Sequence, residues 1–226
     1  MSVKRGLTAL AAIAGVAGLS GCGNKTDENL FLKSLTQRVK GETVQAGPMS
    51  PEQAAAGIQA ALANTDLPVA FVAMPDREAN AVMVHIETNG AYKTWGGGGR
   101  RSITMAGGMI TATRGLGNDI MSSSVGEIAS LIQARKAGSG QHVLRHLNGE
   151  NQTVETVADC QVTRGGRKKV TNATMQNVNT TEMTENCSGS DASFTNSYLV
   201  DGRGRVLQSR QWLGPANGYI VFQTHR

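Results

Sequence analysis

One stretch decides the fold, and it reads Trp95-Gly-Gly-Gly-Gly-Arg-Arg-Ser-Ile-Thr-Met-Ala-Gly-Gly-Met-Ile-Thr-Ala-Thr-Arg-Gly-Leu-Gly-Asn-Asp-Ile-Met121. Two short β-type runs, residues 102–106 and 109–114, flank Gly107-Gly108. Two glycines between such runs predict a β-hairpin, because the tight turns that join antiparallel strands need positive φ. The hairpin leads into a polar, glycine-containing loop over residues 114–119.

Runs with a two-residue apolar period begin at residue 67 and continue to the C-terminus. Besides the hairpin, the predicted strands cover residues 69–74, 81–87, 92–95, 142–147, 153–162, 169–178, 193–200, 205–212 and 218–224. Strong turn signals separate the later strands at Asn148-Gly149, at Asp201-Gly202 and in the run Arg164-Gly-Gly-Arg167. Sequential hairpins at this spacing predict a mainly β fold, a single antiparallel meander that forms a sandwich or closes into a barrel.

Helical signals are confined to the N-terminal part and one later segment. Residues 24–41 and 51–64 are predicted helices. The second has Ser50 as N-cap, Pro51 at its first position and Gln53 to complete a capping box. A short third helix is predicted near residues 124–135, with Ser124 as a candidate N-cap.

The first 21 residues have the layout of an export signal. Lys4 and Arg5 precede an apolar run over residues 7–19, which is shorter than the roughly 20 residues of a membrane-spanning helix. The run ends in Leu19-Ser-Gly-Cys22, which resembles the lipobox of bacterial lipoproteins, so Cys22 is the expected site of lipid attachment. Gly23, in place of Asp, resembles lipoproteins that pass to the outer membrane.

Three segments are therefore expected. Residues 1–21 form a lipoprotein signal peptide, residues 22–66 a lipidated N-terminus with a helical preface, and residues 67–226 one antiparallel β domain. Acyl chains on Cys22 would anchor the protein to a membrane, because each buried CH₂ contributes about 0.8 kcal/mol.

The charge of the chain gives no general indication of nucleic-acid binding. Loss of Lys4 and Arg5 with the signal peptide lowers the formal net charge from +5 to +3. Basic residues are scattered, apart from the cluster over residues 164–169. A solvated turn is the simplest interpretation of this cluster, and binding to an anionic polymer is the alternative. Clustered positive charge attracts anions but does not by itself select a particular ligand.

Cys160 and Cys187 are expected to form a disulfide, because disulfides persist in exported proteins and these two cysteines remain after lipidation of Cys22. Two free thiols are the alternative. Closure of a loop of this length stabilises by about 3–4 kcal/mol in the chain-entropy treatment. A metal site is not expected, because neither Cys has a second ligand nearby in sequence, and His142 and His146 lie about 13 Å apart along a strand.

No segment predicts a catalytic centre or a cofactor site. The chain contains no Gly-x-Ser-x-Gly motif, and its four-glycine run at residues 96–99 lacks the Lys-Ser/Thr and helix start of a phosphate-binding loop. Asp119 and Asp201 could form an acid–base pair, but each stands in a turn-like segment beside Gly, where Asp usually binds backbone N–H groups. We therefore expect no enzyme activity.

Five residues are candidate contacts for a glycan or a partner protein: Trp95, Arg114, Asp119, Arg210 and Trp212. The Trp side chains follow strands and either stack on a sugar ring or pack in the core or at a barrel rim. The Arg side chains end strands and could pair with Asp119 and with the carboxylate of Asp201. We expect residues 114–119 to form a positioned loop that is braced against residues 210–212.

Two motifs carry a family resemblance: Thr113-Arg-Gly-Leu-Gly-Asn-Asp119 and Ser209-Arg-Gln-Trp-Leu-Gly-Pro215. Together with the lipobox, the hairpin after Trp95, the turn at residues 148–151 and the two downstream cysteines, they resemble the YjbF/GfcB family of group 4 capsule lipoproteins. The resemblance covers most of the mature chain, whereas residues 96–99 and 164–169 diverge locally. It implies a mainly β lipoprotein of the outer membrane, facing the periplasm, that accompanies operons for capsule or exopolysaccharide production and export.

Three functional hypotheses follow. The first is a non-catalytic accessory lipoprotein that binds the polysaccharide or another protein of the export operon, with no nucleic-acid partner. The second is a glycan-active hydrolase, which needs paired carboxylates about 5–10 Å apart across a groove. The third is a structural partner in envelope assembly. The family resemblance supplies no catalytic residues.

Overall fold

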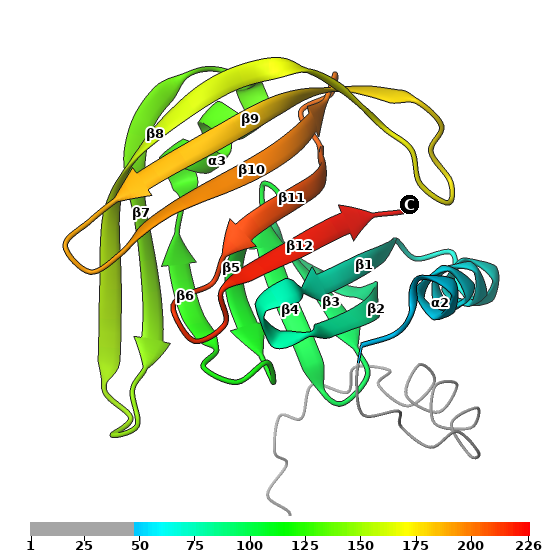
Figure 1. Ribbon diagram of the computed structural model, residues 1–226, viewed down its shortest axis with the longest axis horizontal. Coiled ribbons are helices and arrows are strands. Elements are labelled where there is room, and N and C mark those ends of the chain that lie inside the picture. Colours follow the sequence, from blue (N-terminus) through cyan, green and yellow to red (C-terminus); the bar gives the residue numbers. More distant parts are fainter. Residues whose placement is uncertain (1–47) are drawn as a thin grey trace, which may run out of the picture. The chain divides into compact units, whose positions relative to one another are not determined.

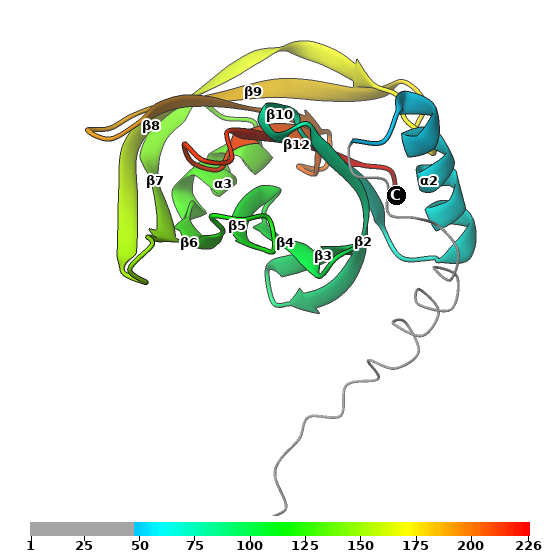
Figure 2. The same ribbon diagram turned by 60° about the horizontal axis from the view of Figure 1, so that its bottom comes forward.

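The computed structural model describes residues 48–226. The signal peptide, Cys22 and the helix expected over residues 24–41 lie outside the described residues. The described part is mainly β, as predicted, and forms a nearly closed antiparallel barrel with two α-helices (Figures 1 and 2). Neither of these helices is long and apolar enough to cross a membrane.

Twelve strands make one sheet, in the order β5-β4-β3-β2-β1-β12-β11-β10-β9-β8-β7-β6. Their bounds are β1 Val69–Met74, β2 Ala79–Asn89, β3 Tyr92–Gly97, β4 Arg101–Ala106, β5 Met109–Arg114, β6 Ile120–Ser124, β7 Gly138–Leu147, β8 Thr153–Val170, β9 Val178–Ser188, β10 Ser193–Asp201, β11 Val206–Trp212 and β12 Tyr219–Thr224. Each neighbouring pair is consecutive in the chain except β1 and β12, so the predicted meander is confirmed.

The hairpin at Gly107-Gly108 is confirmed. The two glycines have φ of +61° and +85°, as a tight turn between β4 and β5 requires. β5 is one edge of the hydrogen-bonded sheet and β6 is the other, although only residues 115–119 separate them in the chain. We call the line along which these two edge strands meet the seam.

Helix α2, Pro51–Asn64, begins as the sequence predicts. Ser50 is the N-cap, its hydroxyl accepts a hydrogen bond from the Gln53 backbone N–H, and the Gln53 side chain completes the capping box. Helix α3, Gly126–Ala134, is the expected short helix, but Val125 is its N-cap and makes no side-chain cap bond. Ser124, the expected N-cap, is instead the last residue of β6.

Helix α3 packs on the concave side of the sheet (Figure 2). Ile128 and Ile132 of α3 are fully buried. The close approach depends on Gly138 and Gly140 of β7, because a Cβ atom at these positions would lie 2.8 Å from Leu131 and 3.1 Å from Ile128. These glycines belong to β7, which begins at Gly138, before the strand predicted over residues 142–147.

One predicted turn is wrong. Residues 164–167 are not a hairpin but lie inside β8, an 18-residue strand, where the register to β9 shifts between Arg164 and Arg167. The turn between β8 and β9 follows at residues 171–177, so the strand predicted over residues 169–178 spans that turn. The strand β9 itself was missed, because its inward-facing side chains include polar residues and carry little apolar periodicity.

Candidate functional site

The seam is closed by side chains of the loop with which the sequence argument began. Thr113 Oγ1 accepts a hydrogen bond of 3.0 Å from the Ile120 backbone N–H, and Arg114 Nη1 donates one of 3.0 Å to the Ile120 carbonyl. Asp119 Oδ1 in turn accepts from Thr113 Oγ1 at 2.9 Å. These side chains thus take the place of a backbone ladder between β5 and β6.

The carboxylate of Asp119 also organises the loop itself. It accepts hydrogen bonds from the backbone N–H groups of Gly115, at 2.8 Å, and Leu116, at 3.1 Å. Gly115 has a φ of +77°, and a Cβ there would lie 2.8 Å from the Arg100 carbonyl oxygen, so the turn requires glycine. Residues 114–119 thus form a positioned loop. Arg114 Nη1 and the Asp119 carboxylate oxygens make hydrogen bonds to backbone groups in and beside it.

The loop is braced by residues that the sequence argument did not select. Asn217 Nδ2 donates to the carbonyls of Gly117 and Asn118, and Arg77 Nη1 donates to the Leu116 carbonyl and to Asn217 Oδ1. Of residues 210–212, the expected brace, one side chain reaches the neighbouring hairpin and makes two hydrogen bonds there. Gln211 accepts from the Ile110 N–H and donates to the Gly108 carbonyl, which binds β11 to the edge strand β5.

Replacing Asp119 with Ala is expected to lower the free energy of unfolding by about 1–3 kcal/mol, because three donors lose their acceptor. Urea unfolding followed by circular dichroism measures the change. Asp191→Ala is the matched control: its carboxylate is exposed and contacts only the neighbouring Ser190, so its effect should stay within about 0.5 kcal/mol. Equal stability of the two variants would show that the seam does not depend on Asp119.

The remaining candidate contacts lie apart from this loop. Trp95 of β3 is only 6% exposed and packs edge-to-face on Phe222, so its ring is part of the core and is not available for sugar stacking. Arg210 is exposed and lies 3.2 Å above the Tyr219 ring in a cation–π contact. Trp212 is half-buried and stacks on Phe194, with ring centroids 4.7 Å apart. Trp95 therefore lies in the core, whereas Arg210 and Trp212 are two residues apart on β11 and both lie next to Tyr219.

The carboxylate pair that a hydrolase would need is not present at Asp119 and Asp201. Asp201 ends β10, immediately before β11, whereas Asp119 lies in the loop held by Asn217, beyond the other end of β11. The seven residues of β11 span about 20 Å, well beyond the separation at which two carboxylates act on one glycosidic bond.

Asp201 is also an unsuitable proton donor. Burial alone would raise the pKa of Asp201, but hydrogen bonds from the Arg205 and Arg203 backbone and from the Arg205 side chain lower it below its ordinary value of 3.8. The group is therefore a carboxylate at neutral pH that holds the β10–β11 turn.

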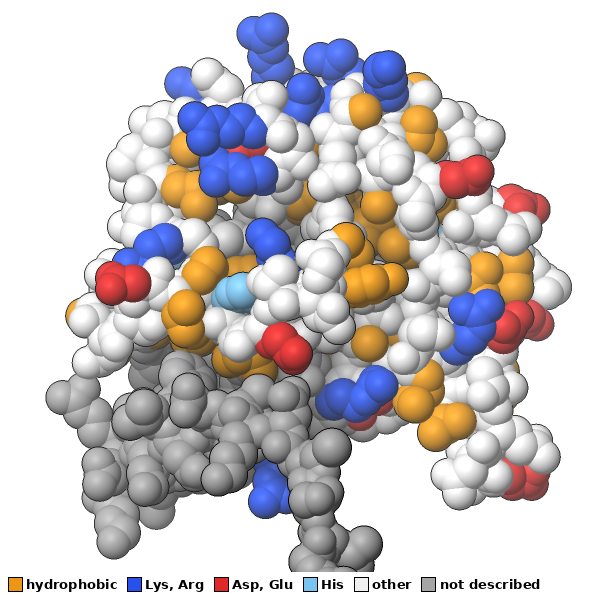
Figure 3. All heavy atoms as spheres, turned by 180° about the vertical axis from the view of Figure 1, so that it is seen from behind, with side chains coloured by type: hydrophobic (Ala, Val, Ile, Leu, Met, Phe, Trp, Pro, Cys, Tyr) orange, Lys and Arg blue, Asp and Glu red, His pale blue; other side chains and the backbone are white. Residues whose placement is uncertain are grey.

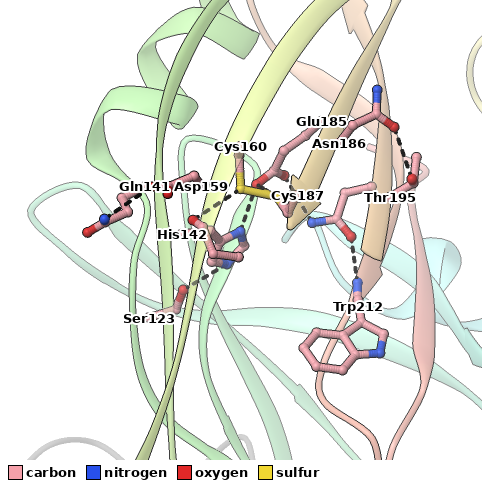
Figure 4. Close-up of a disulfide and its surroundings, with 12 residues drawn as sticks. Ser123, Gln141, His142, Asp159, Cys160, Glu185, Asn186, Cys187, Thr195 and Trp212 are labelled. Atoms are coloured by element: carbon pink, nitrogen blue, oxygen red, sulfur yellow. Dashed lines mark hydrogen bonds and ion pairs between the residues drawn. A yellow bond between two sulfur atoms is a disulfide. The ribbon is translucent and has the colours of Figure 1, made fainter. Parts of the chain in front are cut away.

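A second polar cluster lies inside the barrel, beside the disulfide (Figure 4). Glu185 of β9 is fully buried, and each of its oxygens is hydrogen-bonded. His142 Nδ1 lies 2.7 Å from Oε1, while Asn196 Nδ2 and the Tyr198 hydroxyl donate to Oε2 at 2.9 and 2.7 Å. We call Glu185, His142, Asn196 and Tyr198 the polar centre.

Electrostatics keep this carboxylate ionised. Burial alone would raise the pKa of Glu185, but the hydrogen bonds from His142, Asn196 and Tyr198 and the charge of His142 outweigh it and place the pKa below 4.5. Burial, followed by the nearby Glu185 charge, raises the pKa of Tyr198 well above its ordinary value, so its hydroxyl stays a donor. A buried carboxylate with these partners is an anchor for three strands, β7, β9 and β10.

The expected disulfide is present. Cys160 of β8 and Cys187 of β9 are directly paired across the two strands and bonded to each other. Cys187 therefore lies in strand β9, although it falls outside the strands predicted from the sequence. The bridge joins the two strands next to the polar centre, and Cys187 Sγ lies 3.2 Å from Glu185 Oε1.

The fold brings together four residues of types that can bind metals, although they are far apart in the sequence. Ligand atoms of His142, Cys160, Glu185 and Cys187 all lie within 4.8 Å of one another, and all four residues are buried. Both sulfurs are bonded to each other, so neither offers the thiolate that a zinc site requires. In this oxidised state the cluster is a disulfide packed against a hydrogen-bonded imidazole–carboxylate pair.

Ser123 adds a third member to the His142–Glu185 pair. Its hydroxyl lies 3.1 Å from His142 Nε2, so Ser123, His142 and Glu185 have the connectivity of a nucleophile, base and orienting acid. Two features separate this arrangement from an active site. Ser123 lies within strand β6 rather than on a sharp exposed turn, and the His142 ring is only 3% exposed. The geometry is that of a histidine whose two nitrogens are satisfied internally.

Two pockets of the described part are half open to solvent. One of about 130 Å³ is lined by residues that include Met74, Arg77, Arg101 and Leu116, close to the braced loop. The other, of about 250 Å³, is lined by Arg135, Arg167 and polar residues of β9. Neither is lined by Ser123 or by a member of the polar centre.

The loop at the seam joins the two edge strands of this barrel, and the buried polar centre joins β7, β9 and β10 inside it. Residues 32–224 match the family described as group 4 capsule polysaccharide lipoprotein GfcB, YjbF. The chain belongs to the YjbF family. The two motifs that carry the resemblance contribute Thr113, Arg114 and Asp119 to the seam and Gln211 to its brace. In this YjbF-family member, therefore, the recognisable motifs support the fold.

A crystal structure supports the same fold for this YjbF-family chain. The hypothetical lipoprotein YmcC from Escherichia coli (K12) superposes with a TM-score of 0.67 at 16% sequence identity, covering 87% of this chain and 93% of YmcC. At that identity the likeness concerns the fold alone. A comparison with curated proteins returned no match.

Proposed function

We propose that this chain is a non-catalytic accessory lipoprotein in the production or export of a capsule or exopolysaccharide. The observation that carries the proposal is the family match over residues 32–224, because the family is described by capsule polysaccharide and by lipoprotein character. Cys22 carries the lipid, anchors the protein in the outer membrane, and leaves the barrel on the periplasmic side. The barrel acts by binding the polysaccharide or a protein that exports it.

The internal use of the polar side chains supports a binding role over a catalytic one. Asp119 and Asp201 hold turns, Glu185 holds three strands, and Arg114 holds the seam. A binding function needs none of these groups to change protonation. We therefore expect ligand contact at surface residues whose side chains do not hold turns or strands.

Deletion of the gene is expected to lower cell-surface polysaccharide, and expression of the intact chain should restore it. Surface sugar is measured chemically on washed cells. Cys22→Ala should fail to incorporate palmitate and should restore less polysaccharide than the intact chain, at equal protein level. Unchanged surface polysaccharide in the deletion strain would refute the proposed function. Retention of an export protein on the purified chain, together with no binding to glycan, would favour the partner-binding form.

A further inference from the structure

Cationic side chains are concentrated at one end of the described body. Residues 48–226 contain 16 Lys and Arg and 14 Asp and Glu. Eight of the 16 cations but only two of the carboxylates, Glu182 and Asp201, belong to the segments that meet at this end. The cations are Arg135 and Lys136, the four basic residues between 164 and 169, and Arg203 and Arg205. Figure 3 shows Lys and Arg side chains gathered along the top of the body.

The β8–β9 ribbon builds this end. Residues 164–183, which follow the shift of register after Arg164, form an arch. Its pairing with β10 ends where Thr180 faces Asp201, and residues 169–179 extend beyond that point and curve toward the C-terminus in Figure 1. The tip of the arch docks on the end of β12, where Asn172 Nδ2 donates 2.6 Å to the Thr224 carbonyl and the Thr174 hydroxyl donates to the His225 carbonyl. The arch is therefore held at both ends.

A cleft opens beside this arch. It has a volume of about 250 Å³ and is lined by Arg167, Asn179 and Thr181 of the arch, by Arg135 at the end of α3, and by Gly202 of the β10–β11 turn. We call it the basic cleft. Arg135 Nη1 donates a hydrogen bond of 2.7 Å to the Asp201 carbonyl. This contact fixes the Arg135 guanidinium at the wall of the basic cleft.

The positive charges of the basic cleft are not neutralised by carboxylates of the protein that lie nearby. Asp201 is 4% exposed and its carboxylate is engaged by Arg205 and two backbone N–H groups. Glu182 approaches only Lys168, at 3.9 Å. Within residues 48–226, no carboxylate lies within ion-pair distance of Arg167 or of the exposed Lys169.

We propose that the basic cleft binds a carboxylate-bearing polysaccharide, one rich in uronic acid units, a proposal that rests on the function proposed above. Arg guanidinium groups bind carboxylates through two parallel hydrogen bonds, and the amide of Asn179 and the hydroxyl of Thr181 suit sugar hydroxyls. The volume lies just under the usual range of about 300–1,000 Å³ for enclosed ligand sites, as suits a short stretch of polymer in an open cleft.

The position of the basic cleft favours a polymer over the anchoring membrane. Residue 49 joins the body through two hydrogen bonds to Asn80, next to the end of β1 at Met74. The arch docks near the other end of β1, where His225 binds Val69. Residue 49 is thus held at the Met74 end of β1, and the arch docks at the Val69 end.

The test uses the mature chain, residues 22–226, prepared without acyl groups, and three probes: polygalacturonate, neutral dextran and phosphatidylglycerol vesicles. Arg167→Gln with Lys169→Gln removes one charge that lines the cleft and one beside it, at the position paired with Asn179. Arg100→Gln with Arg101→Gln removes two exposed charges from the β3–β4 turn and the start of β4, near Gly115, and is the matched control. Urea unfolding verifies that both double variants are as stable as the parent chain.

The parent chain is expected to bind polygalacturonate and not dextran, and added salt should weaken the binding. The cleft variant should bind about tenfold more weakly, and the control within about twofold of the parent. Equal weakening in both variants would overturn the proposal, because it would report net charge and not the cleft. Absence of polygalacturonate binding, or cleft-dependent binding to vesicles alone, would also overturn it.

Complementation separates this proposal from the one on which it rests. If the cleft variant restores surface polysaccharide fully in the deletion strain, the basic cleft is refuted while the accessory function stands. If deletion itself changes nothing, the accessory function is refuted whatever the binding assay shows. Partial or absent restoration by the cleft variant, with full restoration by the control, is the expected result.

Discussion

Replacement of Glu185 with Ala is expected to lower the free energy of unfolding by about 3–5 kcal/mol, because a buried carboxylate with three hydrogen-bond partners is lost. The variant leaves His142, Asn196 and the Tyr198 hydroxyl without their acceptor inside the barrel. Urea unfolding measures the change. Glu182→Ala is the matched control on the same strand, because its half-exposed carboxylate has only one distant cation, and it should cost less than about 1 kcal/mol.

The same carboxylate predicts how stability changes with acid. Its pKa in the folded protein is lower than the ordinary value of 4.5, so its contribution is complete above that value. The contribution is lost as the pH falls below 4.5 and through the lowered folded-state pKa. The urea midpoint of the parent chain should therefore fall more steeply over this acid range than that of Glu185→Gln, which cannot ionise. If the urea midpoints of the parent chain and of Glu185→Gln fall in parallel as the pH is lowered, Glu185 is not ionised in the folded protein.

Ser123→Ala is the control that separates support from catalysis in the polar centre. It removes one hydroxyl contact to His142 and should leave surface polysaccharide unchanged. Loss of polysaccharide with unchanged stability would contradict a purely structural centre and would point to a nucleophilic Ser123.

Loss of the Cys160–Cys187 disulfide is expected to cost about 3–4 kcal/mol, because the bridge closes a loop over a sequence separation of 27 residues. Cys160→Ala with Cys187→Ala removes both thiols, and urea unfolding with and without a thiol reductant measures the effect. The reductant should destabilise the parent chain and have no effect on the double variant. Equal midpoints for the parent and the double variant would show that the paired strands alone hold this region.

The disulfide and Glu185 should not contribute independently. Cys187 Sγ and Glu185 Oε1 are 3.2 Å apart, so removal of the bridge changes the surroundings of the carboxylate. A double-mutant cycle of the two changes should give a coupling of about 0.5–3 kcal/mol. Additive losses would mean that the two features stabilise separate parts of the barrel.

The dipeptide Gly-Gly shows how far local sequence predicts this fold. Gly107-Gly108 has positive φ and forms the predicted hairpin, whereas Gly165-Gly166 is not in the left-handed region and lies within β8. Their local signals are alike. The difference lies in the tertiary contacts. Strand β9 pairs with the residues on both sides of Gly165-Gly166, with Met183 opposite Arg164 and Thr181 opposite Arg167. Turn chemistry therefore predicts the meander but not the length of its longest strands.

The polar centre escaped prediction for a related reason. Glu185 and Asn196 are inward-facing residues on strands, positions that apolar periodicity assigns to hydrophobic side chains. The signal that could have located β9 is the paired Cys187, since a bridge to a strand residue favours a second strand. The mutual contacts of Glu185, His142 and Tyr198 arise only when β7, β9 and β10 adopt their register, and single-sequence patterns do not specify that register.

The pairing of β1 with β12 has a consequence for the order in which the chain folds. Every other strand pair joins neighbours in sequence and can form early, because short loops close at little entropic cost. Val72 pairs with Phe222, so the two half-meanders, β1–β5 and β6–β12, join only when the last strand is available. Until then both β1 and β11 present unpaired edges, which can recruit other chains. A newly made chain therefore needs protection from aggregation until its final residues are free to fold.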